Sequence, residues 1–351
     1  EARDAIAKCH SAGIQVRMIT GDHAVTAAAI GHELGIEGMA LSGAQFAALS
    51  DEEVKGKLSD IGVVARVTPE DKIRLVTMLQ EEDNIVAMTG DGVNDAPALK
   101  KADIGVAMGI TGTEVSKGAA TMILTDDNFA TIVKAVEFGR AIYNNLFNFV
   151  RFQMESLVGF IVSYLLAAFF LVLGGTPFTP FVVLWVNFLV QIPVALALGF
   201  DDPAPDLMEK KPRPLKQPIL SRSQWIRIAF IGILMAVGTV YLEALYESSN
   251  AATAASVGFV VFALFMVVLA LSARSETASA THRAELQNPH QPALYAVTLL
   301  MHDLPIYLGF LQRFLGLTEI SGTQWLICIA FALALLLVDE AIKIFMRRSR
   351  A

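Results

Sequence analysis

Residues 88–99 decide the fold of the first part of the chain, and they read Met88-Thr89-Gly90-Asp91-Gly92-Val93-Asn94-Asp95-Ala96-Pro97-Ala98-Leu99. The run 84–88 before them is short and apolar, as is typical of a buried strand. Pro97 stands where a helix could begin, so the pattern predicts a strand, a tight acidic loop and a helix. Two aspartates four residues apart on such a loop can hold Mg²⁺, which accepts a few carboxylates together with phosphate oxygens and water.

A simpler explanation exists for part of this stretch, because Asp-Gly pairs are common in ordinary turns. Asp91-Gly92 alone would be explained in that way. Gly90 and Gly92, however, also let the backbone approach a ligand closely. The whole twelve-residue string is far more specific than the dipeptide, and it favours a catalytic loop.

Two further stretches suggest phosphate chemistry. Thr20-Gly21-Asp22 follows a predicted strand, 14–19, and precedes a predicted helix, 24–34, so Thr20 could bind a phosphoryl oxygen at the carboxyl end of a parallel sheet. A plain N-cap turn is the alternative. Lys72 lies in the first turn of a predicted helix, 70–81, where its charge opposes the helix dipole and calls for a nearby anion. A solvated surface lysine is the alternative there.

The remaining pattern of residues 1–139 alternates strands and helices, which predicts an α/β fold with a parallel sheet. Further strands are expected at 63–67, 104–108 and 122–124. Helices are expected at 1–13, at 113–119 and from Phe129 onward, with a small helical insert at 41–58. Asp126, Asp127 and Asn128 are expected to cap the helix that begins at Phe129.

The composition indicates a membrane portion, because 54% of the 351 residues are hydrophobic and only 17% are charged, against about a quarter in soluble domains. Six apolar spans meet the requirement of roughly 20 residues; they lie at about 148–173, 180–199, 224–245, 255–272, 292–312 and 323–345. The net charge of −7 gives no support to nucleic-acid binding. Cys9 and Cys328 lie far apart, which argues against a disulfide framework.

Lysines and arginines concentrate on alternate links between the spans. They follow the second span, the fourth span and the last span, and include Lys210, Lys211, Arg213, Lys216, Arg222, Arg274, Arg283, Lys343, Arg347, Arg348 and Arg350. The positive-inside rule therefore predicts that the soluble part and the C-terminus lie in the cytosol. We expect a multi-pass protein of the plasma membrane, in contact with membrane lipid.

The string 88–99 resembles the hinge motif of P-type ATPases, the cation pumps that form a phospho-aspartate. Four other stretches resemble the same family, namely 20–22 (TGD), 65–72 (ARVTPEDK), 139–145 (GRAIYNN) and 184–200, with LWVN at its start and LGF at its end. The resemblance is to the calcium-pump-like branch. It implies a partial phosphorylation domain over 1–147, a haloacid-dehalogenase-like α/β fold, followed by an all-α bundle of six transmembrane helices over 148–351.

The resemblance also implies the roles of individual residues. Asp91 would hold Mg²⁺, with Asn94 and Asp95 in support, and Lys72 would neutralise the phosphoryl charge. The second phosphate motif would position the phosphoryl group, and ATP would be the substrate. The residues implied are Thr20, Gly21, Asp22, Lys72, Asp91, Asn94 and Asp95, with Arg66 and Asp22 for the nucleotide.

The chain departs from the family pattern in one important respect. The string Asp-Lys-Thr-Gly-Thr, which carries the phosphorylated aspartate, is absent, and residue 1 already lies inside a helical pattern. We therefore expect this to be the C-terminal part of a pump, with the N-terminal part of the same pump as its partner. A catalytically inactive membrane module or split subunit is the alternative. A membrane-tethered phosphatase would need a nucleophilic aspartate that the sequence does not offer.

Polar residues within the apolar spans are candidates for the ion path, because burying them in lipid is costly. Asn187 and Gln191 share a helix face, and Pro193 frees backbone carbonyls nearby; hydrogen bonding between helices is the alternative. Glu155 is a third candidate, or else an interfacial carboxylate. The resemblance places Leu157 and Phe160 where calcium pumps carry an amide and a carboxylate. The ion therefore stays open among Ca²⁺, Mn²⁺, K⁺, Na⁺ and H⁺.

Overall fold

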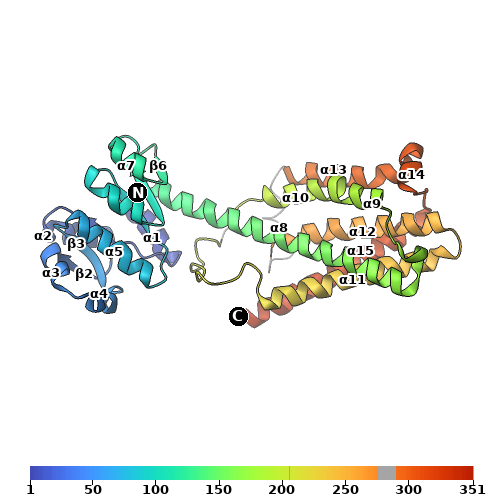
Figure 1. Cartoon of the computed structure of the whole chain (residues 1–351), viewed down its shortest axis with the longest axis horizontal. Helices are drawn as coiled ribbons and strands as arrows, with labels where there is room; N and C mark the ends of the chain where they lie inside the picture. Colours follow the sequence, from blue (N-terminus) through green and yellow to red (C-terminus); the bar gives the residue numbers. More distant parts are fainter. Residues whose placement is uncertain (205, 276–289, 351) are drawn as a thin grey trace. The chain divides into compact units, whose positions relative to one another are not determined.

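The computed structural model describes residues 1–204, 206–275 and 290–350. The chain forms two compact units: Glu1–Arg140 with Pro203–Gln217, and Ala141–Asp202 with Pro218–Ala351. Among these described residues, all the strands lie in the first unit, and the second unit is helical (Figure 1). The predicted fold class, a parallel α/β part followed by a region of membrane-capable helices, is confirmed.

Two three-stranded parallel sheets organise the first unit. One has the order β1 (Met18–Thr20), β3 (Ile61–Ala65), β2 (Met39–Ser42), and the other has the order β4 (Ala87–Gly90), β5 (Ile104–Met108), β6 (Met122–Leu124). In register, Thr20 pairs with Ala65 and Gly90 with Ala107, so each of the two motif-bearing strands ends where its functional loop begins. The helices are α1 (Ala2–Ser11), α2 (Ala24–Glu33), α3 (Gly43–Ala48), α4 (Asp51–Lys57), α5 (Pro69–Glu81), the 3₁₀ turn η1 (Val93–Asp95), α6 (Ala96–Lys101) and α7 (Glu114–Ala119).

One hydrophobic core joins the two sheets. It contains Val64 of β3, Leu75 of α5, Met88 of β4 and Ala107 of β5, all of them buried. Each fully buried side chain of the size of Val, Leu or Met contributes about 1.5–3 kcal/mol relative to exposure. The helix α5 starts at Pro69 after a capping box, in which Thr68 and Asp71 satisfy each other's backbone N–H groups. This cap fixes the turn on which Lys72 stands.

Three predicted elements of the first unit are wrong in part. The strand predicted at 63–67 lies two residues earlier, at Ile61–Ala65, because Arg66 takes a left-handed conformation with φ of 53°. The segment 41–58, predicted as a helical insert, begins with the strand β2, and only α3 and α4 are helical. Four residues are too few to show a strand period, so β2 could not be predicted from the sequence. The strand predicted at 14–19 is limited to Met18–Thr20. Arg17, just before it, instead donates to the carbonyls of Ile61 and Leu58.

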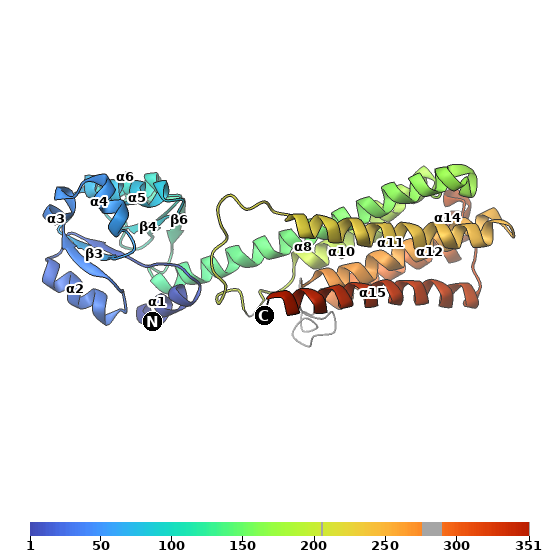
Figure 2. The same ribbon diagram turned by 90° about the horizontal axis from the view of Figure 1, so that it is seen from below.

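The second unit is built from apolar helices (Figure 2). They are α8 (Phe129–Phe170, which begins in the first unit), the turn η2 (Val172–Gly175), α9 (Pro180–Trp185), the π-helix η3 (Val186–Val190), α10 (Gln191–Gly199), α11 (Arg222–Glu247), α12 (Ala251–Ala273), α13 (His290–Tyr307), α14 (Gly309–Leu315) and α15 (Gly322–Arg350). Five helical stretches of the described residues are long and apolar enough to cross a membrane, or six if α13 and α14, bent by 85°, form one span. The six predicted spans fall on these stretches. Pro305 lies inside α13, close to the bend.

Helix α12 packs against both α11 and α15 in the core of this unit. Phe259, Phe262 and Met266 of α12 are fully buried. Small residues allow α8 and α11 to approach closely: a Cβ at Gly232 would lie 2.6 Å from Val158 Cγ1.

Buried ion pairs connect these helices. Arg227 of α11 donates to Asp339 of α15 at 2.6 Å, and the Ser272 hydroxyl of α12 donates to the other oxygen of Asp339. Arg274 binds Asp201 with two donors, at 2.9 and 2.8 Å. Such pairs stabilise only while both partners are present, because an unpaired buried charge costs several kcal/mol. They fix which helices of the unit are neighbours.

Candidate functional site

The acidic loop after β4 is organised by Asp95. One oxygen of its buried carboxylate accepts from the N–H groups of Asp91, at 3.2 Å, and Gly92, at 3.1 Å. Gly90 has to be a glycine for this closeness, since a Cβ there would lie 2.4 Å from Asp95 Cβ. The carboxylates therefore differ in role: Asp95 is committed to the loop, whereas Asp91 and Asn94 are exposed at the end of the strand.

The other oxygen of Asp95 binds Lys72 Nζ at 2.5 Å, with the two side chains 15% and 10% exposed. Burial alone would raise the pKa of Asp95. The hydrogen bond from Lys72 and the N–H groups of Gly92 and Asp91 outweigh that effect, so its pKa lies below the usual value. Lys72 follows β3 and Asp95 follows β4. Their salt bridge thus brings together the loops at the carboxyl ends of the two sheets. The Asp95 carboxylate is the nearby anion that was expected from the position of Lys72 in the first turn of its helix.

A second loop holds the backbone of Asp91 in place. The carbonyl of Asp91 accepts from the N–H of Thr113 and from the hydroxyl of Ser116, both at 2.9 Å. Asp127 holds the start of that loop through the N–H groups of Ile110, at 3.0 Å, and Thr111, at 2.7 Å. These supports were not predicted from the sequence, and Asp127 was expected to cap α8 together with Asp126 and Asn128. Asn128 provides that cap, accepting from Ala130 N–H.

Asp127 gives a pH prediction. Its hydrogen bond from Ile110 N–H and those from Thr111 lower its pKa from 3.8 to about 2. A carboxyl group whose pKa is lower in the folded state than in the unfolded state stabilises the fold at pH values above its unfolded-state pKa. This stabilisation is lost as the pH falls through the folded-state pKa. We expect Asp127→Asn to speed amide hydrogen exchange of residues 109–113 at about pH 5, and the two proteins to converge near pH 2. A difference that persists unchanged to the lowest pH would contradict this assignment.

The second phosphate motif lies at the end of β1. The Thr20 hydroxyl accepts from Asp22 N–H at 3.1 Å, and Asp22 carbonyl accepts from Arg66 N–H at 3.1 Å. Gly21 and Asp22 are exposed, and His23, not this motif, caps α2. Arg66 has φ of 53°, a left-handed conformation that is uncommon for arginine and costs free energy. The geometry therefore joins Asp22 and Arg66, the two residues predicted to contact the nucleotide.

The donor set fits Mg²⁺ in a limited way. In the part of the chain described, Asp91 offers the only carboxylate of the loop that accepts no hydrogen bond, since both oxygens of Asp95 are engaged. Among the described residues no group of three or more His, Cys, Asp or Glu side chains could hold a metal. Mg²⁺ is often bound by one or two carboxylates plus phosphate oxygens and water. Asp91 suits such a weakly anchored ion, and Asp95 acts by positioning the loop.

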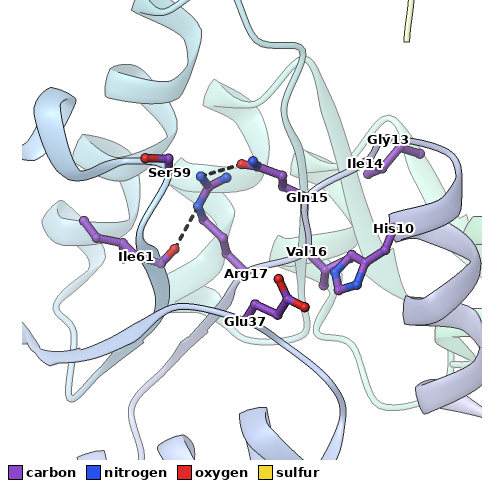
Figure 3. Close-up of a pocket in the computed structure, with 9 residues that line it drawn as sticks. All are labelled: His10, Gly13, Ile14, Gln15, Val16, Arg17, Glu37, Ser59 and Ile61. Carbon is purple, nitrogen blue, oxygen red and sulfur yellow. Dashed lines mark hydrogen bonds between the residues drawn. The ribbon is translucent and has the colours of Figure 1, made fainter. Parts of the chain in front are cut away.

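A polar pocket of about 340 Å³ lies elsewhere in the first unit (Figure 3). Arg17 in its wall donates to Gln15 and to the carbonyl of Ile61, the first residue of β3. The pocket thus lies at the amino ends of β1 and β3, opposite the ends that carry Thr20 and Lys72. We assign no role in phosphoryl chemistry to it.

The second unit contains a cavity of about 380 Å³ beside the predicted ion path. Asn187 lies in the π-helix η3 and Gln191 begins α10, and both line the cavity. π-Helical turns leave backbone carbonyls less regularly bonded and are frequent at functional sites. Asn187 Nδ2 donates to the Val183 carbonyl at 2.8 Å, and this bond does not engage its Oδ1.

Two residues that line this cavity were not predicted from the sequence. Gln153 of α8 accepts a hydrogen bond from Gln191, and the buried Ser156 hydroxyl has no partner in the described chain. Both line the cavity, as do Leu157 and Phe160. A group of neutral oxygens, with an orphaned hydroxyl among them, suits a partly dehydrated cation.

Glu155 lies apart from this cavity. It is 2% exposed, stands 3.9 Å from Arg151, and interacts electrostatically with Arg227, Asp339 and Lys343. Its predicted place in the ion path stays a prediction, and the structure brings it to the buried charges near α11 and α15 instead. His302 similarly uses both ring nitrogens, facing Asp303 Oδ1 at 2.8 Å and the Val260 carbonyl at 3.2 Å.

Comparison with known proteins gives matches over both units. The protein-family model described as "Cation transporting ATPase, C-terminus" matches residues 175–345, and haloacid dehalogenase-like hydrolase models match residues 1–103 and 73–136. The chain belongs to the P-type cation-transporting ATPases. The haloacid-dehalogenase-like fold expected of a P-type ATPase is thereby confirmed, and the chain is a multi-pass membrane protein by its helices and its family.

Individual P-type relatives align over most of this chain. A calcium-transporting ATPase of Bacillus subtilis is 39% identical over 95% of the chain and 38% of its own length. Calcium-transporting ATPase 1 of Schizosaccharomyces pombe is 38% identical over 99% of the chain and 40% of its own length. A probable cation-transporting ATPase F of Mycobacterium bovis is 43% identical over 80% of the chain and 32% of its own length. The chain therefore spans about two fifths of the length of such relatives, or less.

Proposed function

We propose that these 351 residues are the C-terminal part of an ATP-driven cation pump, in which formation and hydrolysis of an aspartyl phosphate drive ion transport. The observation that carries the proposal is the salt bridge between Lys72 and Asp95, since it gathers the loops of both sheets beside the exposed Asp91. That arrangement offers a cation, a free carboxylate and strand-end hydroxyl and amide groups to one phosphoryl group.

Each of these residues has a separate proposed role in binding the phosphoryl group or the nucleotide. Asp91, with Asn94 beside it, would hold Mg²⁺, which neutralises phosphate charge when bound. Thr20 and the exposed Gly21–Asp22 turn would position the phosphoryl oxygens, and Arg66 and Asp22 would contact ATP. The nucleophile would come from the N-terminal part of the same pump, because the string Asp-Lys-Thr-Gly-Thr does not occur in residues 1–351.

The alternative is a catalytically inactive membrane module or split subunit. The absent nucleophile motivates it. Reading the coding sequence upstream of residue 1 discriminates between the two: an in-frame Asp-Lys-Thr-Gly-Thr supports the pump, and a start codon directly before Glu1 supports the alternative.

We place the proposed pump in the plasma membrane, with the first unit and the C-terminus in the cytosol. The basic residues on alternate links support this orientation. The transported ion would pass the cavity between α8 and the η3–α10 segment. Calcium is the first candidate, because relatives are named calcium-transporting. The described residues of the lining offer neutral oxygens and no carboxylate, which lowers the expected Ca²⁺ affinity.

The ion path gives a prediction. We expect Asn187→Leu in the complete pump to raise the cation concentration for half-maximal ATPase stimulation more than about tenfold, because an oxygen ligand and its dipole are lost. ATPase titrations with Ca²⁺, Mn²⁺, K⁺, Na⁺ and varied pH would measure it and would identify the ion. Leu184→Ala, at a half-exposed position one turn earlier, is the control. Equal stimulation curves for Asn187→Leu and the unchanged pump would remove Asn187 from the path.

A further inference from the structure

Glu243 is a fully buried carboxyl group in α11, and the ion path described above does not use it. Neither of its oxygens has a hydrogen-bond partner within the described residues. An ionised carboxylate without a partner in a membrane interior costs several kcal/mol or more, so the ionised form is strongly disfavoured in this conformation. The neutral acid is the form that these surroundings accept.

The carboxyl group lies directly on the backbone of α12. A Cβ placed on Gly258 would be 2.1 Å from Glu243 Oε1 and 2.7 Å from the carboxyl carbon. Gly258 therefore provides the space that the acid occupies. Helix α12 contributes no titratable side chain between Ala251 and Ala273, so no cation on that helix can neutralise the carboxylate.

Among the described residues, few titratable groups face Glu243. Tyr164 of α8 interacts with Glu243 electrostatically, and so does Glu247, which lies on α11 as Glu243 does. The Tyr164 hydroxyl is already committed, as it donates to the Phe178 carbonyl at 2.8 Å. On α15, the Cys328 thiol contacts the carbonyl of Val257, next to Gly258, at 3.8 Å. The turn η2, Val172–Gly175, carries no titratable side chain.

Glu247 connects the buried acid to the end of the helix. It lies four residues after Glu243, on the same helix face, and is only partly buried at the last position of α11. Its carboxylate accepts from Leu173 N–H at 2.9 Å. A second carboxylate is thus fixed one turn from the first, toward solvent.

We propose that Glu243 is a proton-binding site of the membrane unit, whose proton exchanges with the solvent at the α11–α12 turn through Glu247. In the exchange, the O–H bond of the Glu243 acid breaks, the proton passes to the Glu247 carboxylate, and Glu247 releases it to water. The reverse sequence reloads Glu243. This site depends on the helical unit alone and not on phosphoryl chemistry.

Infrared spectroscopy of the full chain in liposomes tests the site. A neutral carboxylic acid in apolar surroundings has a separate C=O stretching band, which shifts when its proton is replaced by deuterium. We expect the wild-type spectrum at neutral pH to contain one such band that E243Q loses and E247Q keeps. We also expect transfer to heavy water to shift this band more slowly in E247Q, by about tenfold or more.

Two results would overturn the proposal. Identical carboxylic-acid bands in the wild type and E243Q would show that Glu243 is not neutral, and an exchange rate unaffected by E247Q would remove the assigned path. Should E243Q fail to fold, Gly258→Ala replaces it, since the added Cβ displaces the carboxyl group and should shift the band. Gly238→Ala, which meets Phe265 and not Glu243, is its matched control and should leave the band in place.

Discussion

Asp91→Ala in the complete pump is expected to lower ATP-dependent phosphorylation by about a hundredfold or more. Asp91 is the exposed carboxylate at the end of β4, and its backbone is held in place by Asp95, Thr113 and Ser116. Truncation removes the proposed Mg²⁺ ligand while leaving those supports intact. The measurement is the amount of acid-stable phosphoprotein formed from labelled ATP.

A control separates this effect from damage to the fold. Asp60→Ala removes another exposed aspartate of the same unit, whose carboxylate accepts a hydrogen bond from the neighbouring Ser59, and should leave the phosphoprotein level unchanged. Normal phosphorylation in Asp91→Ala would refute the assignment of the loop, and with it the proposed function.

Lys72→Met is the second large expected effect, and it acts on stability and on chemistry together. The substitution leaves Asp95 with two N–H donors and no cation in a site where both side chains are mostly buried. We expect a loss of about 2 kcal/mol in the free energy of unfolding, between the values for exposed and fully buried pairs. We also expect phosphorylation to fall about a hundredfold, because the phosphoryl charge loses its cation.

The double variant Lys72→Met with Asp95→Asn distinguishes the two effects. Removing both charges should restore much of the stability, as a neutral pair leaves no uncompensated ion. It should not restore phosphorylation. Denaturant unfolding of the first unit and phosphoprotein formation measure the two outcomes, with Lys55→Met, in an exposed pair with Glu81, as the control expected to change neither. Recovery of phosphorylation in the double variant would assign Lys72 a purely structural role.

Much of this architecture is readable from local sequence patterns. The run Ile61–Ala65 is buried at every position, and Ile104–Met108 is a strand as expected. Strand ends followed by small and acidic residues placed Thr20 and Asp91 correctly at carboxyl ends. These features depend on neighbours in the chain, which is why composition and period suffice.

The pairings within the site depend on the fold and were not readable. Lys72 and Asp95 are separated by 23 residues, and nothing in either segment indicates that the anion required by Lys72 is Asp95. In the membrane unit, Glu155 and Ser156 are neighbours in the chain, yet only Ser156 lines the cavity. Successive residues of a helix point about 100° apart, so a shift of one position replaces a cavity-lining residue with one that faces buried charges.

The ion pair between Arg227 and Asp339 also has a consequence for the order of biosynthesis. Its partners are 112 residues apart, so Arg227 of α11 is made long before the carboxylate it pairs with on α15. A guanidinium can stay near the membrane surface by extending its side chain, but it cannot move inward unpaired without a large cost. We therefore expect α11 to reach its final depth only after α15, which carries Asp339, has been made.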